Sequence, residues 1–241
     1  MSSSDKHLQA NLKALTERIT VAAARAARPS ESIALIAVSK TFPAEAVVAL
    51  ARCGQRHFGE NYVQEALAKI AAVRAAVPEL PLAWHFIGPI QSNKTRQIAE
   101  HFDWVQSVDR LKIAQRLSDQ RPAHLPPLNV LLQVNISGEA SKSGVKPEDL
   151  PSIAHEVAAL PRLRLRGLMA IPEPTDDPVQ QQMPLAAVKR LFDAQREAQR
   201  TAGSADWDTL SMGMSADLEA AIGQGATMVR IGTALFGARG R

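Results

Sequence analysis

The sequence is poor in cysteine and in aromatic residues. Cys53 is the single cysteine among 241 residues, and Phe, Trp and Tyr together make up 4% of the chain. One thiol cannot form a disulfide within the chain, and no Cys/His cluster has the spacing of zinc ligands. Scarce aromatics, with no Lys/Arg run longer than two residues, argue against a stacking platform or basic arm for nucleic acid. A disulfide scaffold and a zinc module are therefore excluded, and we expect no nucleic-acid partner.

Long hydrophobic runs are also missing. No window approaches the run of about 18 apolar residues that a membrane helix needs, and the amino-terminal stretch MSSSDKHLQANLKAL lacks the apolar core of a signal peptide. The sequence thus predicts no membrane partner and a soluble, cytoplasmic protein. Its formal charge of +4 and pI near 9.5 indicate a mildly cationic surface that suits small anionic ligands.

What the sequence does contain is an alternation of short apolar runs with amphipathic helical patterns. Leucine and isoleucine recur every three to four residues between Asp5 and Ala27, which predicts an amphipathic helix. Strands are then predicted at 33–39, 56–59, 83–88, 104–108, 128–135, 164–171, 209–213 and 228–232. Helical patterns lie between them at 43–53, 61–77, 93–102, 109–120, 147–160, 182–202 and 215–223.

This alternation predicts an α/β fold, namely a (β/α)₈ TIM barrel with an extra N-terminal helix. Several strand runs are continuously apolar, as in parallel strands covered on both faces, and such barrels typically take about 250 residues. A doubly wound open sheet is the alternative, although it more often stops at fewer strands. No linker or repeat divides the chain, so we expect one domain over 1–241, with the helix in 1–30 and the barrel in 31–241. The polar segment 171–184 is predicted to be a loop.

Reactive side chains of such barrels come from the carboxyl ends of the strands. Lys40 follows the first strand in IALIAVSKTFP, where a lysine either reaches solvent or presents a partly desolvated amine to a carbonyl group. His85 lies within the third strand, either as a hydrogen-bonded core histidine or, if it points inward, beneath a ligand. Lys142 lies in the loop GEASKSG, where it is either solvated, a transient acceptor of the ligand, or part of an anion gate.

The last two strands end in loops that suit a phosphate group. SMGMS and RIGT each combine glycine with hydroxyl residues directly before a predicted helix. Free backbone N–H groups at such positions bind phosphate, although helix caps and turns would have the same composition. No Walker or G-x-G-x-x-G motif is present, which disfavours a nucleoside triphosphate or a dinucleotide. A lysine and a phosphate cradle at one barrel mouth together point to pyridoxal 5′-phosphate (PLP).

The motifs AVSKTFP, FGENYVQEALAK, WHFIGPIQSNKTR, VNISGEASKSG, GLMAIP and SMGMSADLEAAIGQGATMVRIGTALFG resemble the PLP homeostasis protein family. These are PLP-binding proteins shaped like the barrel domain of alanine racemase. The resemblance extends from Ile33 to Gly237. By this resemblance Lys40 is the lysine that holds PLP as an internal aldimine, and Arg230 faces the pyridine nitrogen. The resemblance also assigns the phosphate region and further cofactor contacts: Ser211, Gly213, Ser215, Gly232 and Thr233, and Asn61 and Met169.

The resemblance implies a carrier or buffer of PLP in vitamin B6 homeostasis, with indirect effects on amino-acid and 2-oxo-acid balance. PLP-requiring apo-enzymes are the expected recipients, and no catalytic residue is assigned. An arginine opposite the pyridine nitrogen makes the ring a weak electron sink, and Tyr62, the single tyrosine, does not match the racemase's second base. We expect a monomer, with a weak dimer as the alternative. An amino-acid racemase of narrow scope and a barrel for another phosphorylated metabolite are the rival functions.

Overall fold

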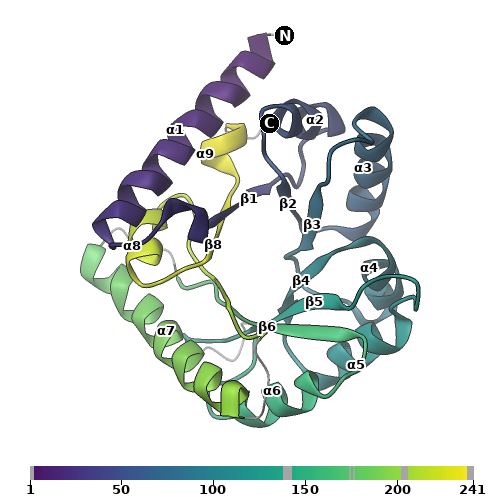
Figure 1. The fold of residues 1–241 in the computed structure, drawn as a ribbon, viewed down its shortest axis with the longest axis vertical. Coiled ribbons are helices and arrows are strands. Elements are labelled where there is room, and N and C mark those ends of the chain that lie inside the picture. Colours follow the sequence, from purple (N-terminus) through teal and green to yellow (C-terminus); the bar gives the residue numbers. More distant parts are fainter. Residues whose placement is uncertain (1–2, 138–142, 174, 176, 202–205, 238–241) are drawn as a thin grey trace.

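A computed structural model describes residues 3–137, 143–173, 175, 177–201 and 206–237. Within these residues eight parallel strands close into a barrel in the order β1 to β8, and each strand pairs with its neighbours in sequence (Figure 1). The strands are β1 Ala34–Val38, β2 His57–Glu60, β3 Ala83–Phe86, β4 Trp104–Val108, β5 Leu128–Gln133, β6 Leu163–Met169, β7 Thr209–Ser211 and β8 Met228–Ile231.

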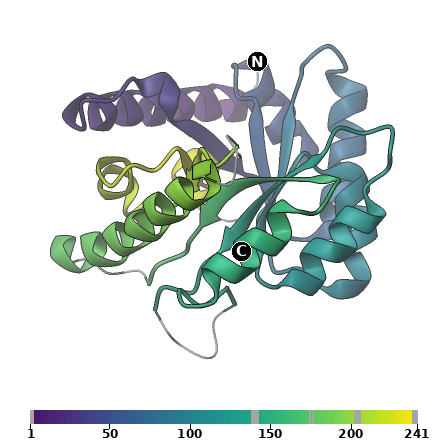
Figure 2. The ribbon, with the colours of Figure 1, turned by 60° about the horizontal axis from the view of Figure 1, so that its bottom comes forward.

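Helices surround the barrel on all sides in Figure 1. They are α1 Ser3–Arg25, α2 Ala44–Arg52, α3 Val63–Ala76, α4 Thr95–His101, α5 Leu111–Gln120, α6 Leu150–Ala158, α7 Pro178–Thr201, α8 Leu218–Gly223 and α9 Thr233–Phe236. Two short 3₁₀ turns, Ser30–Ser32 and Ser92–Lys94, precede β1 and α4. Helix α1 packs against α2, α8 and α9, and α8 lies between α1 and α7 (Figures 1 and 2). The extra helix thus covers the side of the barrel where α2, α8 and α9 lie.

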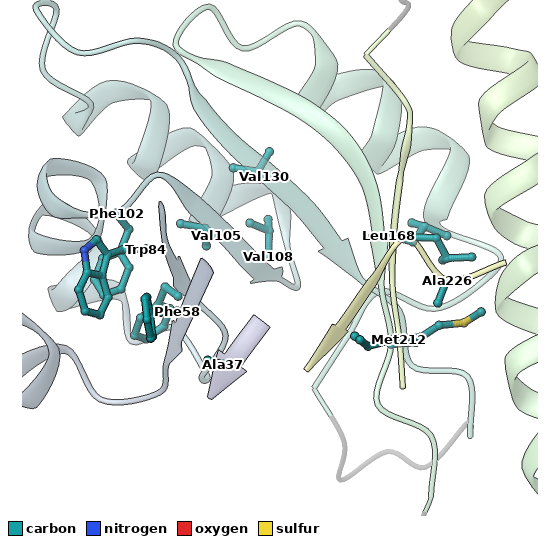
Figure 3. Close-up of a cluster of buried hydrophobic side chains, with 14 of the residues drawn as sticks. Ala37, Phe58, Trp84, Phe102, Val105, Val108, Val130, Leu168, Met212 and Ala226 are labelled. Atoms are coloured by element: carbon teal, nitrogen blue, oxygen red, sulfur yellow. The ribbon is translucent and has the colours of Figure 1, made fainter. Parts of the chain in front are cut away.

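Strand side chains alternate between two apolar cores. The larger core lies between strands and helices, where Phe58, Trp84 and Phe102 gather on one side of the barrel (Figure 3). The smaller core consists of alternate strand residues, Ile36, Trp104, Leu131, Met169 and Met228. Because successive side chains of a strand point to opposite faces, this second set faces the barrel interior. Both faces of the sheet are therefore buried, which explains the continuously apolar strand runs.

The fold predicted from the sequence is confirmed, with corrections at element ends. Helix α7 begins at Pro178, so the segment 171–184 is not a loop throughout as predicted. Proline suits the first turn of a helix because its missing N–H has no partner there, and the carbonyl oxygen of Asp177 accepts from Gln181 N–H. Helix α8 begins at Leu218 rather than at 215, because the carboxylate of Asp217 accepts the N–H of Met214 in a turn (2.6 Å).

Candidate functional site

One cavity of about 410 Å³ lies at the carboxyl ends of the strands. Its size falls in the range of roughly 300–1,000 Å³ that is typical of small-molecule sites. Most of the predicted site residues line it together: Lys40, Asn61, Ser215, Arg230, Gly232 and Thr233. They lie in or directly after β1, β2, β7 and β8. The first two strands are far from the last two in sequence, and closure of the barrel brings β1 next to β8.

Three larger hollows lie elsewhere, on the outer surface. Two of them, of about 600 and 640 Å³, lie around Cys53 and are lined mainly by α1, α2 and α3, and one of about 550 Å³ is lined by the residues just before α2 and by α3. None of the residues predicted for the site lines any of the three. The cavity at the barrel mouth is therefore the candidate functional site.

The backbone on either side of Lys40 is fixed by ionic groups, of which Glu60 and Lys69 are buried. The Ser39 hydroxyl donates to Glu60 Oε1 over 2.6 Å, and Lys69 Nζ donates to the Ser39 carbonyl oxygen over 2.7 Å. The N–H of Thr41 donates to Glu65 Oε1 over 2.7 Å. Thr41 has φ of 68°, which is a costly conformation for a β-branched residue. These contacts hold Lys40 at a defined place on the cavity wall.

Lys69 links the two carboxylates of this network. Its ammonium lies 2.6 Å from Glu60 Oε1 and 2.8 Å from Glu65 Oε1, and its side chain is 4% exposed. Burial raises the pKa of Glu60, while hydrogen bonds from Lys69 and Ser39 lower it in part. Glu60 Oε2 is buried and has no hydrogen-bond partner in the described part of the chain. Sequence analysis did not identify Glu60 or Lys69 as site residues, because a lysine in a helical pattern is expected to face solvent.

Asn61, which lines the cavity, carries a second buried oxygen without a partner. Its Oδ1 accepts no hydrogen bond from the residues that the structure describes. The backbone of Asn61 is closely covered by Gly88, where an added Cβ would lie 2.3 Å from the Asn61 carbonyl oxygen. A buried amide oxygen without a partner costs free energy, and a ligand hydroxyl or N–H in the cavity would satisfy it.

Arg230 supplies a buried cation to the same cavity. Its Nη1 donates to the Ser211 hydroxyl over 2.7 Å, and its Nη2 donates to the Ala170 carbonyl oxygen over 2.9 Å. Burial lowers the pKa of Arg230 to about 10, with Asp217 acting in the opposite direction. The side chain therefore stays charged at neutral pH.

The loops after β7 and β8 form the part of the cavity beside β1. Ser215 and Thr233 bring hydroxyl groups, and Gly232 separates β8 from α9. An added Cβ at Gly232 would lie at ordinary contact distance, 3.5 Å from the Val38 carbonyl oxygen and 3.6 Å from Val38 Cβ. The protein itself does not require glycine there, and a larger side chain would enter the cavity beside Val38.

The remaining predicted residues lie outside the cavity lining. Ser211 is fully buried and contacts Arg230. Gly213 packs against α8, since an added Cβ would lie 2.5 Å from Ala221 Cβ, and its carbonyl oxygen accepts the N–H of Arg230. Met169 belongs to the apolar interior of the barrel. Lys142 lies outside the described residues.

Sequence patterns missed the apolar walls of the cavity. Phe42, Ile87, Ile171 and Met214 line it, and the ring of Phe42 stacks on Phe236 of α9 with 4.6 Å between centroids. Apolar residues just beyond a strand carry no signal that distinguishes a cavity wall from core packing. In the described part of the chain, no group of three or more His, Cys, Asp or Glu side chains could hold a metal ion. Nor does any helix described here have the length and apolar character of a membrane span.

The donor set fits a flat, anionic, phosphorylated ligand. Arg230 supplies a positive charge and Lys40 an amine, while Ser215 and Thr233 supply hydroxyl donors. The apolar walls suit an aromatic ring. Asn61, another lining residue, adds a buried oxygen that has no hydrogen-bond partner among the described residues. PLP, with its aldehyde, ring and phosphate, matches each of these groups in kind.

Comparison with known proteins agrees with this fit. Residues 10–240 match the family described as alanine racemase, N-terminal domain. The pyridoxal phosphate homeostasis protein of Pseudomonas aeruginosa is 62% identical over 229 residues, which are 95% of this chain and 94% of that protein. The protein of the same name from Escherichia coli K12 is 54% identical over 234 residues, covering 95% of each chain.

Solved structures show the same fold. PipY of Synechococcus elongatus PCC7942, solved with PLP bound, aligns with a TM-score of 0.79 and 37% identity over 95% of this chain and 100% of PipY. Alanine racemase from Clostridium difficile 630 has a TM-score of 0.69 at 16% identity, over 98% of this chain and 58% of the racemase, so that likeness concerns the fold alone. With a family match over nearly its whole length and relatives above 50% identity, the chain belongs to the pyridoxal phosphate homeostasis protein family, built on the alanine racemase N-terminal domain.

Proposed function

We propose that this protein binds PLP in the cavity at the carboxyl ends of its strands and acts as a carrier or buffer in PLP homeostasis. The observation that carries the proposal is that Lys40, Arg230, Ser215 and Thr233 all line the same cavity. The names of the homeostasis relatives and the PLP-bound PipY structure support it.

Lys40 is the residue we assign to covalent attachment. Its amine would form a Schiff base with the cofactor aldehyde, with loss of one water molecule. Ser215, Gly232 and Thr233 would hold the phosphate, and Arg230 would face the ring nitrogen. When bound, PLP supplies an electrophilic carbon and an electron-withdrawing ring. Three further residues of the predicted site do not line the cavity. Ser211 holds Arg230, Gly213 supports the loop after β7, and Met169 lies in the interior core.

We further propose that the protein has no catalytic turnover. Among the described residues that line the cavity, Lys40 and Arg230 are the ionisable ones, and an arginine does not act as a base at neutral pH. Tyr62 is 56% exposed and lies outside the cavity lining. A racemase needs a base on each face of its substrate, and the cavity offers a candidate on one face only. PLP-requiring apo-enzymes in the cytoplasm are the proposed recipients, and a monomer stays our prediction.

Reduction with borohydride tests the binding proposal. PLP-saturated protein is expected to show an absorbance band near the visible edge that borohydride bleaches, with the adduct mass on the peptide that contains Lys40. A matched variant, Lys112→Ala, removes an exposed lysine of α5 and should leave band and adduct unchanged. The absence of any band in the PLP-saturated protein would contradict the proposal. Sustained formation of D-alanine or D-serine from the L-isomer, abolished in Lys40→Ala, would instead support the racemase function.

A further inference from the structure

A chain of polar side chains runs through the barrel interior from Arg230. Arg230 Nη1 donates to Ser211 Oγ over 2.7 Å, and Ser211 Oγ donates to Gln106 Oε1 over 2.7 Å. Gln106 Nε2 lies 3.0 Å from His85 Nδ1, and His85 Nε2 lies 3.0 Å from His57 Nδ1. The chain therefore connects β8, β7, β4, β3 and β2.

The contact between Ser211 and Gln106 spans the barrel. Strands β7 and β4 are not neighbours in the closed order β1 to β8, so this hydrogen bond crosses the interior rather than following the sheet. At the far end, His57 is the first residue of β2, on the side of the barrel opposite the cavity. The chain thus joins the cavity to the amino-terminal side of the barrel.

The setting of this chain is apolar and closed. Ser211, Gln106 and His85 have no exposed surface. The Gln106 amide lies 3.6 Å from Met228 Sδ, and the His85 ring stacks on Trp104 with 5.4 Å between centroids. Barrel interiors of this fold are usually filled by branched apolar residues. Polar groups in their place cost free energy unless every one is paired, so packing alone does not explain them.

Arg230 fixes the direction of every hydrogen bond in the chain. A guanidinium has donors only, so Ser211 Oγ accepts from it and gives its own hydrogen to Gln106 Oε1. The Gln106 amide then presents its N–H₂ to His85 Nδ1, which must accept. His85 consequently carries its hydrogen on Nε2 and donates it to His57 Nδ1. Both imidazoles are neutral in this arrangement, which agrees with burial lowering the pKa of His85 and of His57.

The chain holds Arg230 ready at the cavity. With Nη1 tied to Ser211 and Nη2 tied to Ala170, the guanidinium cannot rotate freely before a ligand arrives. A mobile arginine loses rotamer freedom when it binds, and that loss weakens affinity. Gln106 contributes because it sets which way the Ser211 hydroxyl points, and His85 contributes because it sets the orientation of the Gln106 amide.

We propose that Ser211, Gln106 and His85 are positioning residues that orient the Arg230 guanidinium for the cofactor ring through this interior chain. The proposal rests on the proposed PLP function. It assigns a role in cofactor binding to residues that lie below the cavity and do not line it.

A double-variant cycle tests this role. Gln106→Met removes the hydrogen bonds of the amide to Ser211 and His85 at similar volume. We expect about tenfold weaker PLP binding and a shifted absorbance band of bound PLP, with the adduct still on Lys40. In an Arg230→Gln background, Gln106→Met should have no further effect on PLP affinity, because it acts through Arg230. Gln195→Met, the same change at a buried position of α7, is the control and should leave affinity and band unchanged.

Two outcomes would overturn the proposal. Either Gln106→Met binds PLP with wild-type affinity and spectrum, or its effect adds in full to that of Arg230→Gln, as expected for a general loss of packing. If Gln106→Met does not fold, Ser211→Ala replaces it in the same cycle. Absence of PLP binding in the wild-type protein would count against the proposed function itself, which separates the two failures.

Discussion

The ammonium of Lys69 donates to the carbonyl oxygen of Ser39 over 2.7 Å and so ties helix α3 to the residue directly before Lys40. The same ammonium pairs with Glu60 at the end of β2. A buried ion pair thus lies behind the amine that we assign to the cofactor. Such a pair contributes little net stability, but removing one partner leaves an uncompensated charge.

Replacing Lys69 with methionine should therefore destabilise the fold. We expect Lys69→Met to lower the free energy of unfolding by about 3–5 kcal/mol at neutral pH, because Glu60 stays buried without its cation. Urea unfolding followed by circular dichroism measures the change. Lys112→Met on the exposed face of α5 is the control and should change stability by less than about 0.5 kcal/mol. Equal stability of both variants would show that the Glu60 pair does not support the fold.

The neutral histidines of the interior predict loss of stability in acid. Burial lowers the pKa of His85 well below its ordinary value and lowers that of His57. In the unfolded chain both histidines take up protons below about pH 6.5. The unfolded state then binds more protons than the folded state, so the free energy of unfolding decreases as the pH is lowered. Each histidine that stays neutral costs up to about 1.4 kcal/mol per pH unit below that value.

Comparison with a variant isolates this effect from other titrating groups. The raised pKa of Glu60 acts in the opposite direction, since its stabilising contribution is lost as pH rises. Between roughly pH 7 and pH 5, we expect the unfolding free energy of the double variant His57→Gln/His85→Gln to fall less steeply with decreasing pH than that of the wild type. Parallel profiles would mean that these histidines are protonated in the folded protein.

Enlarging Gly232 should affect binding more than folding. An added Cβ meets Val38 at ordinary contact distance, so the fold tolerates it, while a longer side chain enters the cavity. We expect Gly232→Leu to weaken PLP binding about tenfold or more, since overpacking costs about 1–3 kcal/mol. Gly223→Leu, where nothing lies within 4 Å of an added Cβ, should bind PLP as the wild type does. Fluorescence titration of PLP measures both, and unchanged affinity in Gly232→Leu would remove Gly232 from the site.

Gly213 should matter for folding rather than for direct contact with a ligand. It has φ of 95°, and an added Cβ would lie 2.5 Å from Ala221 Cβ. Gly213→Ala is therefore expected to cost about 2 kcal/mol or more, from backbone strain and from the clash. Gly54→Ala shares the positive φ without any neighbour and should cost less. Adding Ala221→Gly to Gly213→Ala should restore part of the stability; no restoration would place the cost in the backbone alone.

The sequence predicted the barrel because strands and helices have different local patterns of apolar residues. Runs such as ALIAV of β1 are apolar on both faces, and helical repeats separate them. It failed at the ends of α7 and α8, where the side chain of Asp217 and a proline at a helix start decide the boundary. Those contacts depend on a few atoms and have no period.

The site divides in the same way. Local sequence patterns were sufficient to place Lys40 at a strand end, and glycine and hydroxyl residues after β7 and β8. Folding was needed to bring Glu60 and Lys69 to the backbone beside Lys40, and to connect Gln106 and His85 with Arg230 through the interior. The reason is physical: closure of the barrel brings side chains from non-neighbouring strands within hydrogen-bond distance, and no local pattern encodes which buried polar groups then meet.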